Sequence, residues 1–208
     1  MSLGMTMTEF LQNTRTATEV IIDLINKLNG QTILLDHLNS MSQYYGRQKA
    51  VLHKFEDEDV RIKNLAEEMV DLGKEKTEER KQMIRDIAVN GSVEYLSQSL
   101  LQIARHGIVS VHGGKAKCKN KVSLWNIGSS SQDIVEVIWE GRNQSIHFED
   151  PSNFRNPVKN CFNDLKKYHK NLELYDKKRN MAFVIIELLG WNGEEGYSTF
   201  EDTMLKLA

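Results

Sequence analysis

Apolar residues recur at intervals of three and four along almost the whole chain, and this spacing predicts α-helices. The first apolar stripe runs from Leu11 to Leu28. Thr8 is placed to cap that helix, and Asn29-Gly30 predicts its end, because Asn and Gly accept the left-handed conformation that closes a helix. No long run alternates between apolar and polar residues as a strand would. The pattern therefore predicts an all-α protein.

The stripes that follow predict further helices, separated by glycines or acidic residues. A second helix is predicted over residues 33–55, and the carboxylates of Glu56–Asp59 suit the N-terminus of a third, where they favour the helix dipole. That third helix is predicted to end near Gly73, with another beginning at Thr77. Asn90-Gly91 then predicts a break in the chain.

The second half repeats this pattern with clearer helix starts. Ser92 predicts the cap of a helix ending near Gly107. Ser129–Ser131 offers several caps for the next helix, which Asp133 favours from its first turn and Pro151 closes.

Three more helices are predicted before the end of the chain. Asn156-Pro157 predicts the start of one, Asp176 the cap of another that ends at Gly190, and Ser198–Glu201 spells a capping box for the last. Met1–Gly4 reads as a leader ahead of the natural start. We therefore predict a helical region over residues 5–90, which can pack into the same domain, and an up-and-down helical bundle over residues 91–208.

Composition narrows the functional classes only slightly. A chain of 208 residues with 40% hydrophobic content can bury a sizeable core, and a net charge of -2 gives no general attraction to nucleic acid or anionic lipid. Cys118 and Cys161 lack the spacing of a metal site. The sequence has no apolar run of about 18 residues, so we predict a cytoplasmic protein without membrane contact. We predict no cofactor.

One segment is locally basic. No acid occurs between Leu101 and Lys121, and we predict a surface loop or small hairpin there. This segment is either a solvated connection or a surface that binds RNA phosphates. In the second case a nearby aromatic residue can stack on a base. The candidate RNA-binding residues are Lys115, Lys117, Lys119, Lys121 and Trp125.

The helix closed by Pro151 carries three polar residues with chemistry of their own. Arg142 falls at helical spacing from Val135 and Ile138, which predicts that it lies on the packed stripe, while Asn143 and His147 are one turn apart. A guanidinium offers a planar donor fork to phosphate, and an imidazole moves protons near neutral pH. Arg142 and His147 lie five residues apart, about 140° around a helix, so they would converge only if two copies met across a two-fold axis.

These residues resemble the hallmark of the HEPN (higher eukaryotes and prokaryotes nucleotide-binding) superfamily. That hallmark is an arginine, a polar residue that is often asparagine, and a histidine after four to six positions; Arg142-Asn143-Gln144-Ser145-Ile146-His147 fills it with four. The resemblance spans residues 92–189 at most. It implies an all-α bundle that dimerises through the motif helix, and metal-independent RNA cleavage of a bacterial defence or toxin–antitoxin type. By the same resemblance Arg142 and His147 would be the catalytic pair, oriented by Asn143.

Two hypotheses follow. The first is a homodimeric RNA-binding protein that cleaves RNA at Arg142, Asn143 and His147. The second is a non-catalytic helical module that dimerises or recruits an antitoxin or another helical protein. A metal site of His106, His112 and His147 is not predicted, because no carboxylate accompanies them locally.

Overall fold

The structure is a computed structural model, and it describes residues 5–52, 60–88 and 91–208. The predicted leader and the acidic cluster at 56–59 lie outside these residues. The predicted all-α class is confirmed, and over the described residues the only β pairing is an isolated bridge between Asn126 and Asp133.

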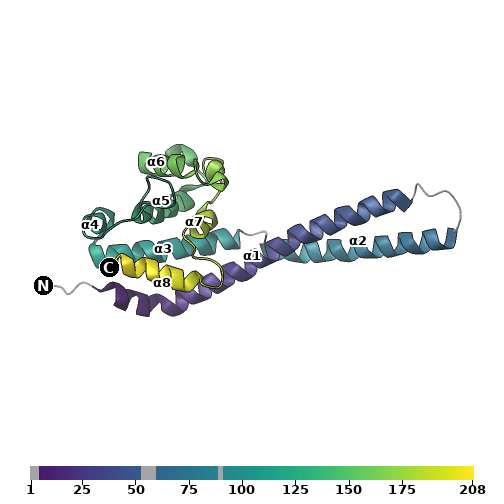
Figure 1. Cartoon of the computed structure of the whole chain (residues 1–208), viewed down its shortest axis with the longest axis horizontal. Helices are drawn as coiled ribbons and strands as arrows, with labels where there is room; N and C mark the ends of the chain where they lie inside the picture. The colour runs from purple at the N-terminus through teal and green to yellow at the C-terminus, as the bar shows by residue number, and fades with distance from the viewer. Residues whose placement is uncertain (1–4, 53–59, 89–90) are drawn as a thin grey trace. The chain divides into compact units, whose positions relative to one another are not determined.

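The helices are labelled in Figure 1. The first five are α1 (Met7–Leu52), α2 (Val60–Ala88), α3 (Ser92–His112), α4 (Lys115–Lys119) and α5 (Ile134–His147). The last three are α6 (Asn156–Leu165), α7 (Ala182–Leu188) and α8 (Gly196–Lys206), and the short 3-10 helices are η1 (Pro151–Asn153) and η2 (Lys170–Leu174). None of the described helices is both long enough and apolar enough to span a membrane.

The chain divides into two units. Unit 1 joins the residues up to Asn26 with Val93–Ala208, and unit 2 is Lys27–Ser92. The first part of α1 thus belongs with the C-terminal helices, whereas the sequence pattern grouped it with the rest of residues 5–90.

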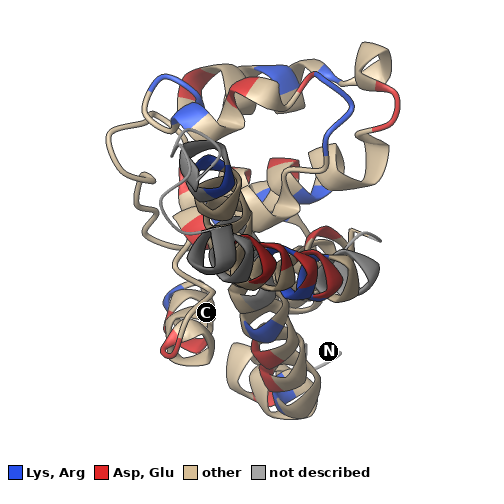
Figure 2. Cartoon of the chain, turned by 90° about the vertical axis from the view of Figure 1, so that its right-hand side faces the viewer, with Lys and Arg blue, Asp and Glu red and all other residues tan. Residues whose placement is uncertain are grey.

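Unit 2 is built on the second part of α1 and on α2. Lys49 Nζ on α1 lies 2.7 Å from an Asp71 carboxylate oxygen on α2, and the Ser42 hydroxyl donates to Glu78 at 2.9 Å. The higher number on α1 pairs with the lower number on α2, so the two helices run antiparallel. Acidic and basic residues are interspersed along them (Figure 2).

The predicted helix ends at Asn29-Gly30 and Gly73 are wrong, because α1 and α2 run through them. A Cβ at Gly73 would lie 3.1 Å from the ring of Tyr45, so this glycine lets the two helices of unit 2 approach. Thr77 does not start a helix; its hydroxyl donates to the Gly73 carbonyl at 2.7 Å. A Cβ at Gly30 would meet nothing within 4 Å. A 46-residue helix tolerates this glycine, whose cost is only about 1 kcal/mol.

In unit 1, α3 packs closely against the first part of α1 and against α8. A Cβ at Gly107 would lie 2.7 Å from the Phe10 ring and 2.8 Å from the Met204 methyl. This glycine is therefore a packing position, and the predicted helix end near it is wrong: α3 continues to His112. The His112 ring, itself buried, hydrogen-bonds the Leu207 carbonyl at 2.6 Å and ties α3 to the end of α8.

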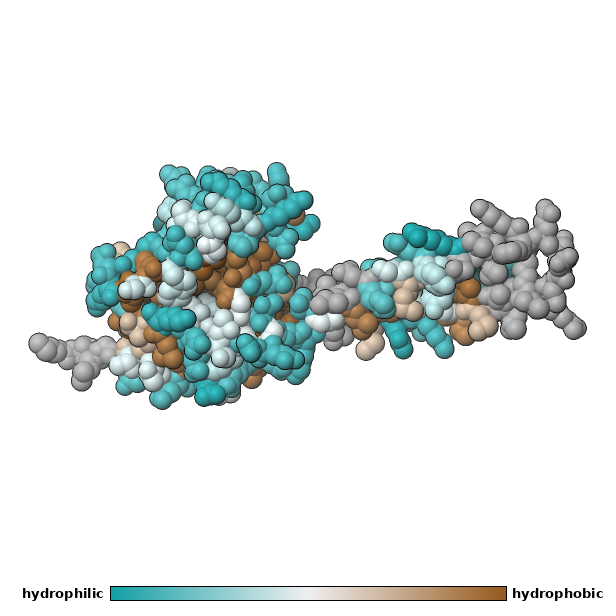
Figure 3. All heavy atoms as spheres, viewed as in Figure 1, coloured by the Kyte–Doolittle hydropathy of each residue, from teal (hydrophilic) through white to brown (hydrophobic). Residues whose placement is uncertain are grey.

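A large apolar core holds unit 1 together. Trp191 is fully buried, and its ring meets that of Phe200 edge-on at 4.9 Å. Phe162, also fully buried, stacks on Tyr175 at 5.1 Å. Figure 3 shows one face of the molecule, on which apolar groups reach the surface of this unit between polar ones.

The basic segment folds differently from the predicted loop or hairpin. Gly113 and Gly114 have positive φ angles of 78° and 138° and make a turn, after which α4 forms over Lys115–Lys119. Backbone dihedrals of this kind favour glycine, so the turn is encoded by the Gly-Gly pair.

Of the helix starts after α4, the one predicted at Asn156-Pro157 is confirmed, and the others differ from the predicted ones. The cap of α5 is Asp133, whose carboxylate accepts from the Glu136 N–H at 2.9 Å, whereas Ser129–Ser131 does not cap it. Asn156 is the first residue of α6, and α8 begins at Gly196, two residues before the predicted capping box. The predicted start of α7 at Asp176 differs more, because α7 begins at Ala182. The side chain of Gln144 hydrogen-bonds the backbone of residues 175–181 and keeps that segment from forming a helix.

Candidate functional site

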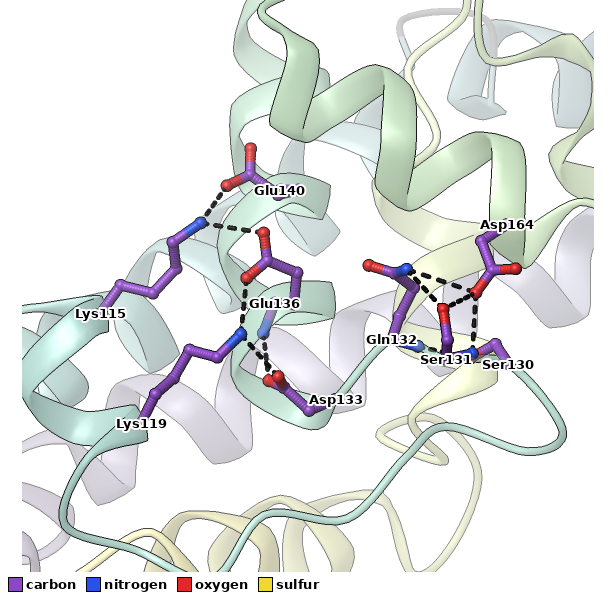
Figure 4. Close-up of polar contacts among 9 residues, drawn as sticks. All are labelled: Lys115, Lys119, Ser130, Ser131, Gln132, Asp133, Glu136, Glu140 and Asp164. Carbon is purple, nitrogen blue, oxygen red and sulfur yellow. Dashed lines mark hydrogen bonds and ion pairs between the residues drawn. The ribbon is translucent and has the colours of Figure 1, made fainter.

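The candidate site is built around α5, which is mostly enclosed by its own chain. Val135 and Ile138 are fully buried, and Gly141 lets α7 approach so closely that a Cβ there would lie 3.0 Å from Ile185. At its N-terminal end, Ser131 donates its N–H and hydroxyl to Asp164 of α6 at 2.7 and 2.6 Å (Figure 4). These hydrogen bonds, that of the hydroxyl first, lower the pKa of Asp164 well below its usual range.

The positions of α5 that are not buried form one stripe along the helix, which we call the accessible stripe. It consists of Glu136, Trp139, Arg142, Asn143, Ile146 and His147. These positions follow three- and four-residue spacing, as one side of a helix does. Arg142 was predicted to lie on one packed stripe with Val135, Ile138, Trp139 and Ile146. Val135 and Ile138 are fully buried, whereas Arg142, Trp139 and Ile146 are half-buried, so that stripe is packed only in part.

A cavity of about 580 Å³ opens beside this stripe, between α4, α5, η1 and the start of α6. Its polar and aromatic lining comes from all of these elements. The residues that matter to its chemistry are Lys115, Trp139, Glu140, Asn143, His147 and Arg155. Two of the three motif residues, Asn143 and His147, therefore line one cavity, and His147 is exposed to solvent.

Glu140 is a buried carboxylate that lines this cavity. It is 2% exposed, and its two carboxylate oxygens accept from Lys115 at 2.6 Å and from Asn143 at 3.0 Å. Lys115 also donates to Glu136 at 3.0 Å (Figure 4). Burial pulls the pKa of Lys115 down, but the hydrogen bonds and charges of Glu140 and Glu136 outweigh it and raise the pKa. Asn143 is thus held in place by an anchored carboxylate.

Arg142 points its guanidinium toward α3 and does not line the cavity. Its Nε donates to Gln102 at 2.6 Å, and one Nη donates to the Asn143 amide oxygen at 3.4 Å. Burial, and then the charge of Arg105, lower the pKa of Arg142. Within one chain the predicted pair Arg142 and His147 is therefore divided: the histidine faces the cavity and the arginine lies beside it.

The predicted RNA-binding residues are only partly gathered at the cavity. Lys115 lines it, whereas Lys119 lies 2.6 Å from Asp133 and 3.0 Å from Glu136. Burial opposes a charged Lys119, yet these two carboxylates raise its pKa.

The other three predicted RNA-binding residues do not line the cavity. Lys117 and Lys121 are exposed. Trp125 is half-buried, with the Lys206 ammonium 5.9 Å from its ring. The segment from Leu101 to Lys121 contains no acid of its own, but α5 supplies the carboxylates that neutralise two of its lysines.

Of the six lining residues that matter to the cavity's chemistry, three were missed from the sequence: Trp139, Glu140 and Arg155. Trp139 and Glu140 do carry a signal, since they lie one turn before the motif residues on the same helix. Arg155 carries none, because only the fold brings the start of α6 to the cavity.

The cysteines and the other histidines do not extend the site. Burial, helped by the charge of Asp133, raises the pKa of Cys118 to about 11, and burial also raises that of Cys161, so both thiols are protonated near neutral pH. Among the residues that the structure describes, no three His, Cys, Asp or Glu side chains come together as they would around a metal ion.

No family model matches the chain, and neither a curated protein nor a solved structure matches it significantly. The resemblance of Arg142–His147 to the HEPN hallmark therefore stays a prediction.

Proposed function

We propose that this chain is a HEPN-type protein that binds RNA in the cavity beside α5 and cleaves it there without a metal ion. The observation that carries the proposal is the lining of that cavity: His147 and Asn143 share it with Trp139, Lys115 and Arg155. An imidazole, an amide, an aromatic ring and the exposed guanidinium of Arg155 are groups that hold and break a phosphodiester next to a base, whereas the charge of Lys115 is matched by Glu140 and Glu136.

Each group has a role that its position supports. Arg155 is exposed and meets the phosphate backbone as a charge, and Trp139 is an aromatic residue of the lining that a base can contact. Asn143 is anchored on Glu140, so its amide is fixed when it hydrogen-bonds a phosphate oxygen. His147 is exposed at the end of α5, where it is free to exchange protons.

The reaction is a transesterification within the RNA. The 2′-oxygen attacks the adjacent phosphorus as its proton passes to a base, and the bond from phosphorus to the 5′-oxygen breaks as that oxygen takes a proton. The products are a 2′,3′-cyclic phosphate and a 5′-hydroxyl. One imidazole cannot be base and acid at once, so we propose a dimer through the accessible stripe, in which His147 of each copy supplies one role.

The test uses two oligonucleotides of one sequence, a single-stranded RNA and its DNA counterpart, incubated with the full chain in EDTA. We expect the RNA to be shortened to fragments ending in a 2′,3′-cyclic phosphate, and the DNA to stay intact because it lacks the 2′-hydroxyl. Structured RNA run in parallel defines the preferred form. Intact RNA under all these conditions, or cleavage that EDTA abolishes, would refute the proposal.

A non-catalytic interaction module is the second candidate, favoured by the described part of unit 2. Met69, Leu72 and Met83 of α2 are 67%, 52% and 67% exposed, and helical spacing places them within about 60° of one another. Large exposed apolar side chains on one side of a helix, here alternating with charged ones such as Lys76, are a feature of surfaces that receive another helix. This candidate predicts no RNA cleavage and an oligomeric state that His147→Ala leaves unchanged.

A further inference from the structure

We propose that Arg105 of α3 and Arg142 of α5 together bind a phosphate group, at a seat beside the cavity. Arg105 belongs to no motif in the sequence. The inference rests on the proposed function only for the source of the phosphate, which that function identifies as an RNA backbone. The phosphate-binding site, or seat, is supported by the contacts of the two arginines alone.

The two guanidiniums are brought together by a pair of facing rows. On α3, Gln102 and Arg105 are one turn apart, and on α5, Trp139 and Arg142 are one turn apart. The rows are joined at both positions: Arg142 Nε donates to Gln102 at 2.6 Å, and the Arg105 guanidinium carbon lies 4.4 Å from the centroid of the Trp139 ring. Their closeness also shows in the lowered pKa of Arg142, to which the Arg105 charge contributes after burial.

Neither positive charge is matched by an acid. Among the ion pairs of the described residues, none includes Arg105 or Arg142. The acceptors of Arg142 are neutral amide oxygens, from Gln102 and Asn143. The Nε of Arg105 is buried and has no hydrogen-bond acceptor.

This state is unfavourable without a ligand. Two half-buried like charges repel each other, and a buried N–H donor without an acceptor is unfavourable. Two lysines of α4 differ from the arginines in this respect. Lys115 and Lys119 each form ion pairs with two carboxylates at the start of α5 or along it. The unmatched pair is therefore a specific feature of the α3–α5 junction.

A phosphate beside the two arginines compensates their unmatched charge. Its oxygens accept from two guanidinium forks at once, and its negative charge removes the repulsion. Trp139 contacts Arg105 and lines the cavity, and Asn143 contacts Arg142 and lines the cavity. An RNA strand that occupies the cavity can thus place a neighbouring phosphate on the two arginines.

The experiment measures binding by the full chain, separately from cleavage. Inorganic phosphate, pyrophosphate and a fluorescent single-stranded RNA are each titrated against the wild type, Arg105→Met, Arg105→Lys and Arg179→Met. Methionine keeps an apolar stem over Trp139 without the charge, lysine keeps the charge without the fork, and Arg179 is an exposed control outside the seat. The melting temperature of each variant without ligand is recorded alongside.

We expect Arg105→Met to weaken binding about tenfold or more, as loss of a charged hydrogen-bonding group does. Arg105→Lys should fall between it and the wild type, and Arg179→Met should bind as the wild type does. Without ligand, Arg105→Met should melt close to the wild type, because it removes a repulsion together with the contact between the guanidinium and the Trp139 ring. The slope of RNA affinity against salt should fall by about one in Arg105→Met.

The outcomes separate this inference from the proposed function. Phosphate or pyrophosphate binding that depends on Arg105, in a protein that does not cleave RNA, supports the seat and refutes the nuclease. RNA binding that depends on Arg105 without binding of the small anions identifies a backbone phosphate, and the reverse identifies a free phosphate. If neither anion nor RNA binds more weakly to Arg105→Met than to the wild type, or if nothing binds at all, the inference is overturned, even where RNA is cleaved.

Discussion

Replacing His147 with alanine is expected to slow RNA cleavage by about 100- to 10,000-fold, the usual contribution of a positioned general acid or base. His147 is the histidine of the cavity lining and is exposed, so its imidazole is placed to take the proton of the 2′-hydroxyl. Because it lies at the exposed end of α5, its loss removes little packing. The melting temperature should therefore change little.

The measurement is the initial rate of RNA cleavage in EDTA at several RNA concentrations. A fall in kcat with little change in KM would mark a role in the chemical step. His37→Ala is the matched control, since His37 is also an exposed helical histidine and does not line the cavity. A folded His147→Ala protein that cleaves at the wild-type rate would show that the imidazole has no part in the reaction.

Replacing Gln144 with leucine is expected to lower the free energy of unfolding by roughly 3–5 kcal/mol. Gln144 is fully buried, and its amide donates to the carbonyls of Tyr175 at 3.0 Å and Arg179 at 2.7 Å. Its amide oxygen accepts from the Met181 N–H at 3.0 Å. Leucine fills similar space but leaves these three backbone groups without a partner, at a cost of roughly 1–3 kcal/mol each and less than additively.

Urea unfolding followed by circular dichroism measures this loss. Gln12→Leu is the control, because Gln12 is exposed on α1 and a surface change of this kind stays within about 0.5 kcal/mol. Gln144→Glu should destabilise as well, since a carboxylate would face two carbonyl oxygens. Equal midpoints for wild type and Gln144→Leu would mean that the segment from Tyr175 to Met181 does not depend on this amide.

Helical periodicity predicted the fold class, but glycines misled the prediction of helix ends. Gly73 and Gly107 were interpreted as stops, and each proves to be a place where a ring from another segment, Tyr45 or Phe10, would collide with a Cβ. A glycine that ends a helix and a glycine that lets two helices approach look alike in one sequence. Only the partner element, far along the chain, distinguishes them.

The site was predictable to the extent that it lies on one helix. Asn143 and His147 share a side of α5 by spacing alone, and both line the cavity. The charge state of the basic segment was not predictable, because its carboxylate partners Glu136 and Glu140 lie on the next helix. Arg105 lies in the same basic segment, but its contact with Trp139 was not predictable, because that ring also comes from the next helix.

The most direct test of RNA binding in this cavity is to map where RNA touches the chain. Single-stranded RNA containing 4-thiouridine is bound to the full chain in EDTA, irradiated, and the crosslinked peptides are identified by mass spectrometry, with unmodified RNA as competitor. We predict that competitor-sensitive crosslinks fall on Trp139, Phe154 or their neighbours along the cavity. Crosslinks confined to other segments such as α2, with none on residues 134–158, would contradict RNA binding at this site.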